Sequence, residues 1–432
     1  MRKNLLFIVI LACTLTACSA KDEPVQGMDR SRLNIGTYYL RPYACSEENV
    51  KALADCDIDF VVCMQDDKPT LDLFSKYGVG AVVSGILPGW WGGDGERAGK
   101  LEEINPMEKY EEAAAKFESH PAIWGIDIGD EPSALDFPYY GKVFKRVDEL
   151  FPQQFPYLNL YPNYASVAVN SATQTINQLG TTTYAEHIAE YCKNVPADYL
   201  CYDFYVYSCD VPHAYDNLRI VADACRANSL SMWIVLQVNS LYPERWISEN
   251  QLRFQAYSAM AFGVENIIWA CWTAGWWSNQ VLDGNGNKTE QYPKLKKINA
   301  EIRTMADAYM KYRNVKTSFI GFKGTDWLAA DGLEGVEVLS DGVFEDLRLT
   351  DDTPLLAGSM IKRSAGKGSA LFVCSVDDPM DENPSDHTLR FKTSAKKVSA
   401  IGPAGPVTPS KDAEGYWTLP LASNQSCLIE VR

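Results

Sequence analysis

Short apolar segments alternate with longer amphipathic segments along most of the chain. Eight of the short segments contain six to eight residues each and are rich in branched and aromatic side chains, so we expect them to form β-strands. They are Asn34–Tyr39, Ile58–Met64, Gly80–Ile86, Ile123–Ile128, Pro156–Tyr161, Tyr199–Tyr205, Ser231–Val238 and Asn266–Trp272. Helical spacing marks segments between them, including Pro106–Ser119, Tyr184–Cys192, Tyr215–Asn228 and Glu249–Phe262. Eight alternating strand–helix units predict a parallel sheet closed into a (β/α)₈ barrel.

The pattern changes after Arg313. Short alternating segments follow one another there, separated by Gly, Pro, Asp and Asn: Leu355–Ile361, Ala370–Val376, Thr388–Phe391 and Ser426–Val431. Such segments are typical of an antiparallel β-sandwich. We therefore expect an α/β protein with its barrel at residues 33–313 and a small C-terminal antiparallel β-sandwich domain at residues 314–432, which supports the barrel.

The N-terminus has the features of an export signal. Arg2 and Lys3 precede an apolar run that is too short to cross a membrane and that ends at Leu15-Thr16-Ala17-Cys18. These four residues resemble the lipobox of bacterial lipoproteins, which implies cleavage before Cys18 and lipidation of its thiol. The resemblance predicts a signal peptide at residues 1–18, a linker at residues 19–32, and an anchor in the outer membrane of the cell envelope, at its periplasmic face or at the cell surface.

Composition narrows the range of partners. The net charge of −16 argues against nucleic acid, because a phosphate backbone requires clustered Lys and Arg. The four histidines are widely spaced, so we expect no histidine-based metal site, and no motif implies a cofactor. Of the twelve cysteines, several lie inside apolar segments, and no Cys-x-x-Cys occurs. Most are therefore expected to be buried thiols.

Side-chain alternation indicates which residues face the barrel axis. On the fourth predicted strand the inward set is Gly125, Asp127, Gly129 and Glu131, whereas Trp124, Ile126 and Ile128 are expected to pack on the helices. The same alternation points these residues inward near the carboxyl ends of their strands: Tyr38, Asn159, Tyr161, Asp203, Tyr205 and Gln237. A barrel of this kind carries its active site at that end.

The most informative motif runs from His120 to Pro132 and ends in Asp130-Glu131-Pro132. Glycoside cleavage needs one carboxylic acid to protonate the leaving oxygen and a second group to attack or stabilise the sugar cation. Glu131 is the candidate general acid, because like-charge neighbours and partial burial can keep its pKa raised. The alternative interpretation is that the three residues only cap the next helix.

This motif resembles the fourth strand of a clan of retaining barrel glycosidases that includes many β-galactosidases and β-glucanases. In that clan an Asn-Glu pair ends strand four, and its Glu is the acid/base; Asp130-Glu131 occupies that place here. The clan's nucleophile is a Glu at the end of strand seven, where this chain has Gln237. An amide cannot form the glycosyl ester, so the resemblance implies a glycosidase whose second catalytic group differs.

Three explanations remain open for that second group. Asp203 on strand six could act through a water in an inverting reaction. Asp130-Glu131 also resembles the adjacent Asp-Glu pair of β-N-acetylhexosaminidases, in which the acetamido group of the substrate attacks, the Asp orients it, and the Glu is the acid. In the third explanation catalysis has been lost, and the protein is a carbohydrate-binding lipoprotein.

Aromatic residues in the loops after strands three and eight support a sugar site. Flat rings stack on the C–H faces of sugars, and such residues are expected on the catalytic face of the barrel. The predicted substrate-binding set comprises Tyr38, Trp90, Trp91, Asn159, Tyr205, Gln237, Trp272 and Trp276. The sequence thus predicts a glycoside hydrolase with an oligosaccharide or polysaccharide substrate.

Overall fold

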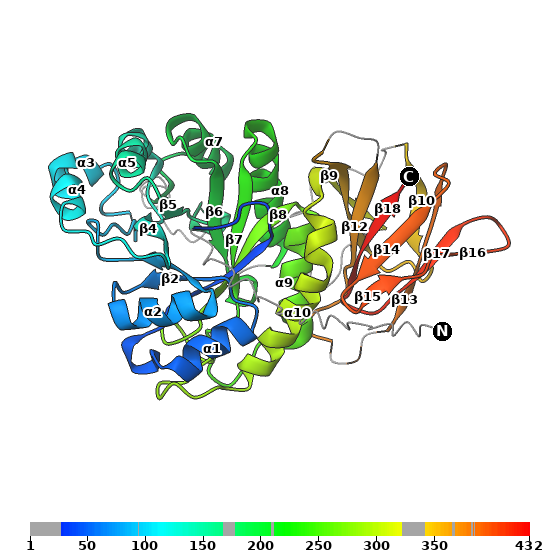
Figure 1. Cartoon of the computed structure of the whole chain (residues 1–432). Helices are drawn as coiled ribbons and strands as arrows, with labels where there is room; N and C mark the ends of the chain where they lie inside the picture. Colours follow the sequence, from blue (N-terminus) through cyan, green and yellow to red (C-terminus); the bar gives the residue numbers. More distant parts are fainter. Residues whose placement is uncertain are drawn as a thin grey trace, which may run out of the picture.

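The computed structural model describes residues 27–93, 95–166, 178–208, 211–321, 342–364, 368–381, 383 and 385–432. The predicted signal peptide with Cys18, and most of the predicted linker, lie outside the described residues. None of the helices in these ranges is both long and apolar enough to span a bilayer. Figure 1 shows the two parts of the molecule, a barrel coloured blue to yellow-green and a β-sandwich coloured yellow to red.

Eight parallel strands form the barrel. They are β1 (Asn34–Tyr38), β2 (Phe60–Met64), β3 (Gly80–Val83), β4 (Ile123–Asp130), β5 (Phe155–Asn159), β6 (Tyr199–Phe204), β7 (Ser231–Gln237) and β8 (Val264–Ala270). Hydrogen bonds connect them in the order β5-β4-β3-β2-β1-β8-β7-β6. The sheet closes where Leu160 pairs with Tyr202 and donates its N–H to the carbonyl of Cys201 at 2.9 Å. The predicted (β/α)₈ barrel is confirmed.

Helices surround the strands (Figure 1). They are α1 (Glu47–Asp55), α2 (Lys68–Tyr77), α3 (Leu101–Ile104), α4 (Met107–Ala114), α5 (Phe137–Leu150), α7 (Tyr184–Asn194), α8 (Val211–Asn228), α9 (Glu249–Ala261) and α10 (Gln291–Tyr309). Local sequence sets several of their ends. Thr183 and Ser248 each begin a helix with a capping box, and Gly78 ends α2 in a left-handed conformation.

Aromatic side chains fill the N-terminal end of the barrel. Tyr199 stacks on Trp233 with ring centroids 4.2 Å apart, and its hydroxyl bonds to two backbone groups of β5. The guanidinium of Arg30, which precedes β1, lies over the rings of Phe155, Tyr199 and Trp233. This end is therefore closed by packing. Polar side chains that face the axis gather toward the carboxyl ends of the strands.

The C-terminal part is an antiparallel β-sandwich, as predicted. Its strands are β9 (Tyr312–Ile320), β10 (Phe344–Leu349), β11 (Leu355–Lys362), β12 (Ser369–Ser375), β13 (His387–Thr393), β14 (Val398–Gly402), β15 (Gly405–Val407), β16 (Ser410–Lys411), β17 (Trp417–Leu421) and β18 (Ser426–Val431). One sheet has the order β10-β13-β17-β16 and the other β15-β14-β18-β12-β11-β9.

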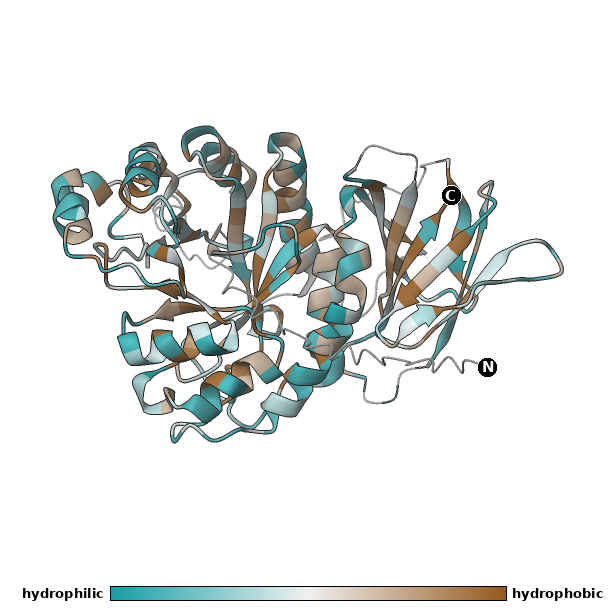
Figure 2. Ribbon diagram, viewed as in Figure 1, coloured by the Kyte–Doolittle hydropathy of each residue, from teal (hydrophilic) through white to brown (hydrophobic). Residues whose placement is uncertain are grey.

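The larger sheet is buried on both faces. Leu355 and Leu371 belong to the core of the sandwich, whereas their neighbours Leu356 and Phe372 belong to the hydrophobic core of the barrel. The strands β11 and β12 contact α9, and β14 and β18 contact α10. In Figure 2 many residues of these strands have the brown colour of hydrophobic residues, whereas α9 and α10 also contain hydrophilic residues, coloured teal. The sandwich and the barrel therefore share apolar packing, as expected of a supporting domain.

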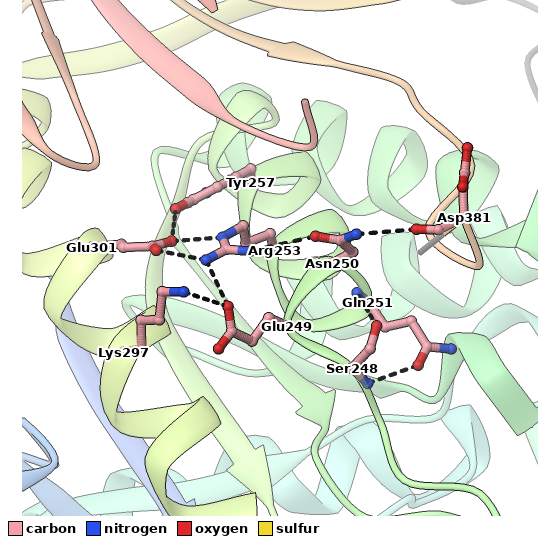
Figure 3. A network of polar contacts seen from close by, with 9 residues as sticks. All are labelled: Ser248, Glu249, Asn250, Gln251, Arg253, Tyr257, Lys297, Glu301 and Asp381. Atoms are coloured by element: carbon pink, nitrogen blue, oxygen red, sulfur yellow. Dashed lines mark hydrogen bonds and ion pairs between the residues drawn. The ribbon is translucent and has the colours of Figure 1, made fainter. Parts of the chain in front are cut away.

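A polar network continues this contact (Figure 3). Arg253 on α9 makes a bidentate ion pair with Glu301 on α10, with N···O distances of 2.8 and 2.7 Å. At the start of α9, Asn250 donates to the carbonyl of Asp381, which lies between β12 and β13. The side chain of Arg253 is only 7% exposed, so its charge depends on this pairing.

The cysteines in the described ranges are all free. Six of these nine are buried, namely Cys56, Cys201, Cys225, Cys271, Cys374 and Cys427. Their surroundings are the apolar cores and the barrel interior, so the prediction of buried thiols is confirmed for this part of the chain.

Candidate active site

The carboxyl ends of the barrel strands contain several unusual backbone conformations. Tyr39 after β1, Cys63 in β2, Glu131 after β4 and Trp277 after β8 all have positive φ angles, between 46° and 63°. Residues other than glycine adopt this region at an energetic cost, and such residues cluster at functional sites. The strain therefore coincides with the end of the barrel at which the sequence places the candidate residues.

Strand β4 deviates from simple alternation. Asp127 pairs with Tyr157, but Gly129 pairs with Leu158 and Asp130 with Asn159, so Ile128 is an extra residue in the ladder. A bulge of this kind reverses the facing of all later residues. Asp130 consequently faces the barrel interior beside Asn159. A similar shift near the start of β4 turns Trp124 inward, into the interior cluster.

Two expectations about β4 are therefore wrong. Strict alternation placed Trp124 against the helices and Gly129 toward the barrel axis, because it did not include the two register shifts. Trp124 instead belongs to the interior cluster, and Gly129 faces Tyr140 of α5. Gly129 allows the second shift, because it has φ 151° and an added Cβ would lie 2.2 Å from the hydroxyl of Tyr140.

Asn159 connects two carboxylates. Its Nδ2 donates to Asp130 Oδ1 at 3.1 Å and to Asp203 Oδ1 at 2.8 Å. Asp203 comes from β6 and is 4% exposed, whereas Asp130 is partly exposed. Because both carboxylate oxygens contact the same nitrogen atom, the two carboxylates lie side by side in the barrel.

The environment raises the pKa values of both groups. Burial, together with the charge of Asp203, raises the pKa of Asp130 to about 7. Burial raises the pKa of Asp203 to about 6, against hydrogen bonds from Asn159, Tyr164 and Tyr205 that lower it. Two carboxylates this close resist double ionisation, so the pair holds a proton more readily than two separate aspartates would.

Glu131 lies next to this pair and is partly exposed. Its left-handed conformation (φ 46°) lets its N–H bond to the carbonyl of Asn159 at 2.8 Å, while its Oε2 accepts from Trp91 Nε1 at 3.2 Å. Burial, followed by the charges of Asp203 and Asp130, raises the pKa of Glu131 well above its usual range. A raised pKa favours the protonated form of this carboxyl group, which is the form that can donate a proton.

The loop after β3 holds Trp91 over Glu131. Trp91 forms a parallel bridge with Asp130, and Gly92 donates its N–H to the Asp130 carbonyl at 3.0 Å. Gly92 is required at this approach, because an added Cβ would lie 1.6 Å from the carbonyl oxygen of Glu131. Trp91 is 60% exposed. It is an anchored aromatic surface of the kind that can stack on a sugar.

A second aromatic group lies beside β1, β6 and β8. Trp276 packs against Tyr38 with ring centroids 5.6 Å apart, and against Tyr205 at 5.7 Å. Trp277 packs against Tyr205 at 5.0 Å. Tyr205 also contacts Asp203, so this group borders the carboxylate pair on the side of β6. Tyr38, Tyr205 and Trp276 thus lie at the predicted end of the barrel.

Three residues of the predicted substrate-binding set have other surroundings. Trp90 is 4% exposed and Trp272 fully buried, and both belong to the core outside the barrel. Gln237 is 1% exposed. It donates both amide hydrogens to Ser208 and to a carbonyl, and it accepts the N–H of Tyr207. These side chains are structural here, because neighbouring elements already use their surfaces or polar atoms.

Sequence reasoning missed Tyr39, Cys63, Tyr157 and Tyr164. Tyr164 follows β5 and bonds to Asp203, and Tyr157 lies beneath Asn159 in the barrel. The inward alternation of β5 could have identified Tyr157, since it lies two residues before Asn159. No sequence signal marks Cys63, whose left-handed conformation places it next to Asp127.

Comparisons with protein-family models and with curated proteins find no match. Among solved structures, a cycloisomaltooligosaccharide glucanotransferase from a Paenibacillus species matches with TM-score 0.53 and 9% identity, over 93% of this chain and 85% of that chain. Xylanase 10B from Thermotoga maritima matches with TM-score 0.42 and 13% identity, over 62% of this chain and 95% of its own. An endo-1,4-beta-mannanase from Rhizomucor miehei matches with TM-score 0.39 and 7% identity, over 56% and 87%.

These neighbours are named as enzymes that act on glycosides, and at such low identity the likeness concerns the fold alone. The glucanotransferase match extends over both the barrel and the sandwich, since it covers 93% of the chain. The likeness to that structure therefore concerns the fold of both parts of the chain.

Proposed function

We propose that this protein is a glycoside hydrolase and that Glu131 is its general acid. The observation that carries the proposal is the group of three carboxyls, Asp130, Glu131 and Asp203, at the carboxyl ends of the strands. Asn159 joins two of them, and burial raises the pKa of all three. A glycosidase needs one carboxyl that stays protonated at neutral pH. The raised pKa of Glu131 suits it to that role, and Trp91 provides an exposed ring beside it.

For the second catalytic group we propose Asp130 in preference to Asp203. Asp203 is 4% exposed and lies behind the amide of Asn159, which leaves little access for an attacking water. Asp130 faces the same interior and is partly exposed. It immediately precedes Glu131 in the chain, so the two carboxyls approach a bound sugar from the same side, that of β4. This arrangement favours the substrate-assisted route.

In that route the substrate carries a 2-acetamido group. Its carbonyl oxygen attacks C1, the C1–O bond to the leaving group breaks, and the proton of Glu131 moves to the leaving oxygen. Asp130 in its ionised form accepts the acetamido N–H and stabilises the positive charge of the oxazolinium intermediate. Water then adds at C1 while the C1–O bond of the oxazolinium breaks and the acetamido group re-forms. The water gives its proton to the Glu131 carboxylate, so two displacements at C1 retain the configuration.

The test uses paired aryl glycosides with and without the acetamido group. Glu131→Gln should lower kcat by roughly 10²–10⁴ for a poor aryl leaving group. It should have far less effect on a dinitrophenyl leaving group, which needs no protonation. Glu112→Gln, at an exposed position on α4, is the matched control and should behave as the wild type. Equal losses with both leaving groups would contradict the role of general acid.

Product configuration separates the remaining mechanisms. Retention limited to acetamido sugars, with Asp130→Asn the more damaging change, supports the substrate-assisted route. Inversion, with Asp203→Asn the more damaging change, would instead assign Asp203 as the base for an attacking water. Sugar binding without turnover of any substrate would indicate the carbohydrate-binding lipoprotein. Proton NMR of the first product formed distinguishes retention from inversion.

We propose further that the protein acts at the cell envelope, anchored by a lipid on Cys18. The proposal rests on the charged start, the short apolar run and Leu15-Thr16-Ala17-Cys18. Cys18→Ala should move the protein from the membrane fraction to the soluble fraction. Cys13→Ala, within the same apolar run, is the control and should leave the protein in the membrane fraction. A Cys18→Ala variant that remains membrane-bound would refute the anchor.

A further inference from the structure

All polar atoms of the Asn159 side chain are used within the protein. The two hydrogens on Nδ2 go to Asp130 and Asp203, and Oδ1 accepts from the thiol of Cys201 at 3.4 Å. The side chain is 3% exposed. With the amide reversed, its oxygen would face two carboxylate oxygens, so this orientation is the favourable one. Asn159 therefore has no hydrogen left for a sugar hydroxyl.

The orientation of Asn159 is set by a chain of hydrogen bonds across the barrel. Tyr38 Oη lies 2.8 Å from Tyr157 Oη, which lies 3.5 Å from Cys201 Sγ. Each of these groups has one hydrogen, and the amide oxygen at the end has none to donate. Tyr38 therefore donates to Tyr157, Tyr157 to Cys201, and Cys201 to Asn159. Burial raises the pKa of all three donors, so they keep their hydrogens.

We propose that Asn159 is a positioning residue that holds Asp130 and Asp203 as one carboxylate pair, and that Cys201 orients it. The amide donates to both carboxylates and receives polarisation from the aligned donors behind it. It thereby favours the ionised form of Asp130, which the proposed function needs for binding the acetamido N–H. The expected effect on hydrolysis rests on the proposed function, whereas the expected effect on the pKa values of the two carboxylates does not.

The pair has further titratable neighbours on every side. Asp127 and Glu131 face it from β4, Cys63 from β2, and Tyr205 and Tyr164 from the segments after β6 and β5. Tyr38 on β1 and Cys201 on β6 lie within electrostatic range of the pair, and burial, which raises their pKa values, keeps them uncharged. Loss of the Asn159 amide removes the donor that the two carboxylates share. The pKa values of both should then rise by roughly one pH unit.

Infrared spectroscopy of the whole protein tests this without a substrate, because protonated carboxyl groups have their own C=O band. Asn159→Leu, which has similar volume and no donor, should shift the titration of that band upward by about one pH unit. Loss of this band in Asp130→Asn or in Asp203→Asn would assign it to the carboxylate pair. In the pH profile of kcat/KM, the apparent pKa of the acid limb should rise by the same amount. An unchanged titration together with a raised KM would overturn the proposal and make Asn159 a sugar ligand.

A second pair of variants covers the case in which Asn159→Leu does not fold. Cys201→Ser keeps a donor to the amide oxygen and should titrate as the wild type does. Cys201→Ala removes that donor and lets the amide turn. The titration of the band should then move to higher pH, as in Asn159→Leu. Identical titrations in both variants would refute the orienting role of Cys201. A band shift in a protein with no hydrolytic activity would support the positioning role and reject the proposed function.

Discussion

The stability of the protein should depend on pH through His387 in the sandwich. Its Nδ1 lies 2.6 Å from Asp351 and its Nε2 2.8 Å from Asp377, and the residue is 6% exposed. Burial alone would lower the pKa, but the two carboxylates outweigh burial and raise it to about 9. The imidazolium links the turn after β10, the end of β12 and the start of β13.

The size and sign of the effect follow from linkage. Raising a histidine pKa from 6.5 to about 9 corresponds to roughly 3 kcal/mol of stability for the charged form. This is an upper value, because the carboxyl side chain of Asp351 is 42% exposed and its attraction is screened, whereas that of Asp377 is 10% exposed. Because the folded-state pKa is the higher one, the stability is complete below pH 6.5 and is lost as the pH rises to about 9.

His387→Gln removes the charge and should remove this pH dependence. Urea unfolding followed by near-UV circular dichroism, at steps from pH 6 to pH 10, measures it. The wild type should lose on the order of 2–3 kcal/mol across this range relative to the variant. His120→Gln is the matched control, since its partner Asp72 is exposed, and it should retain the wild-type dependence. If His387→Gln loses stability with pH as steeply as the wild type, the assigned role of the imidazolium is wrong.

Three other changes test different parts of the structure. Trp91→Ala should raise KM by about 10-fold or more, in line with roughly 1–2 kcal/mol of stacking, and Trp91→Phe should recover part of that loss in steady-state kinetics. Glu301→Leu should cost roughly 2–3 kcal/mol in urea unfolding, because it leaves the buried charge of Arg253 with the longer ion pair to Glu249, and the double variant with Arg253→Met should cost less than Glu301→Leu alone. Gly92→Ala should reduce activity with little change in urea unfolding, because the added methyl group displaces the loop from Glu131.

The sequence by itself determined the architecture. Eight short apolar segments that alternate with helical segments leave few alternatives to a closed parallel barrel. The end of the barrel at which chemistry is expected follows from strand direction, so Glu131, Asp203 and Asn159 could be placed together before the structure was known. These predictions rest on local patterns, which depend little on distant parts of the chain.

The tertiary structure decided which side chains face the interior at β4 and which aromatics reach the surface. The extra residue Ile128 depends on Gly129 fitting beneath Tyr140 of α5, a contact with no local signal in the sequence. Trp272 is buried because α10 covers it, with Tyr292 at 5.9 Å, while Trp91 remains exposed. Burial of a tryptophan is set by its neighbours in space, and strand facing reverses with one inserted residue. Both therefore depend on long-range packing, which periodicity along the chain does not contain.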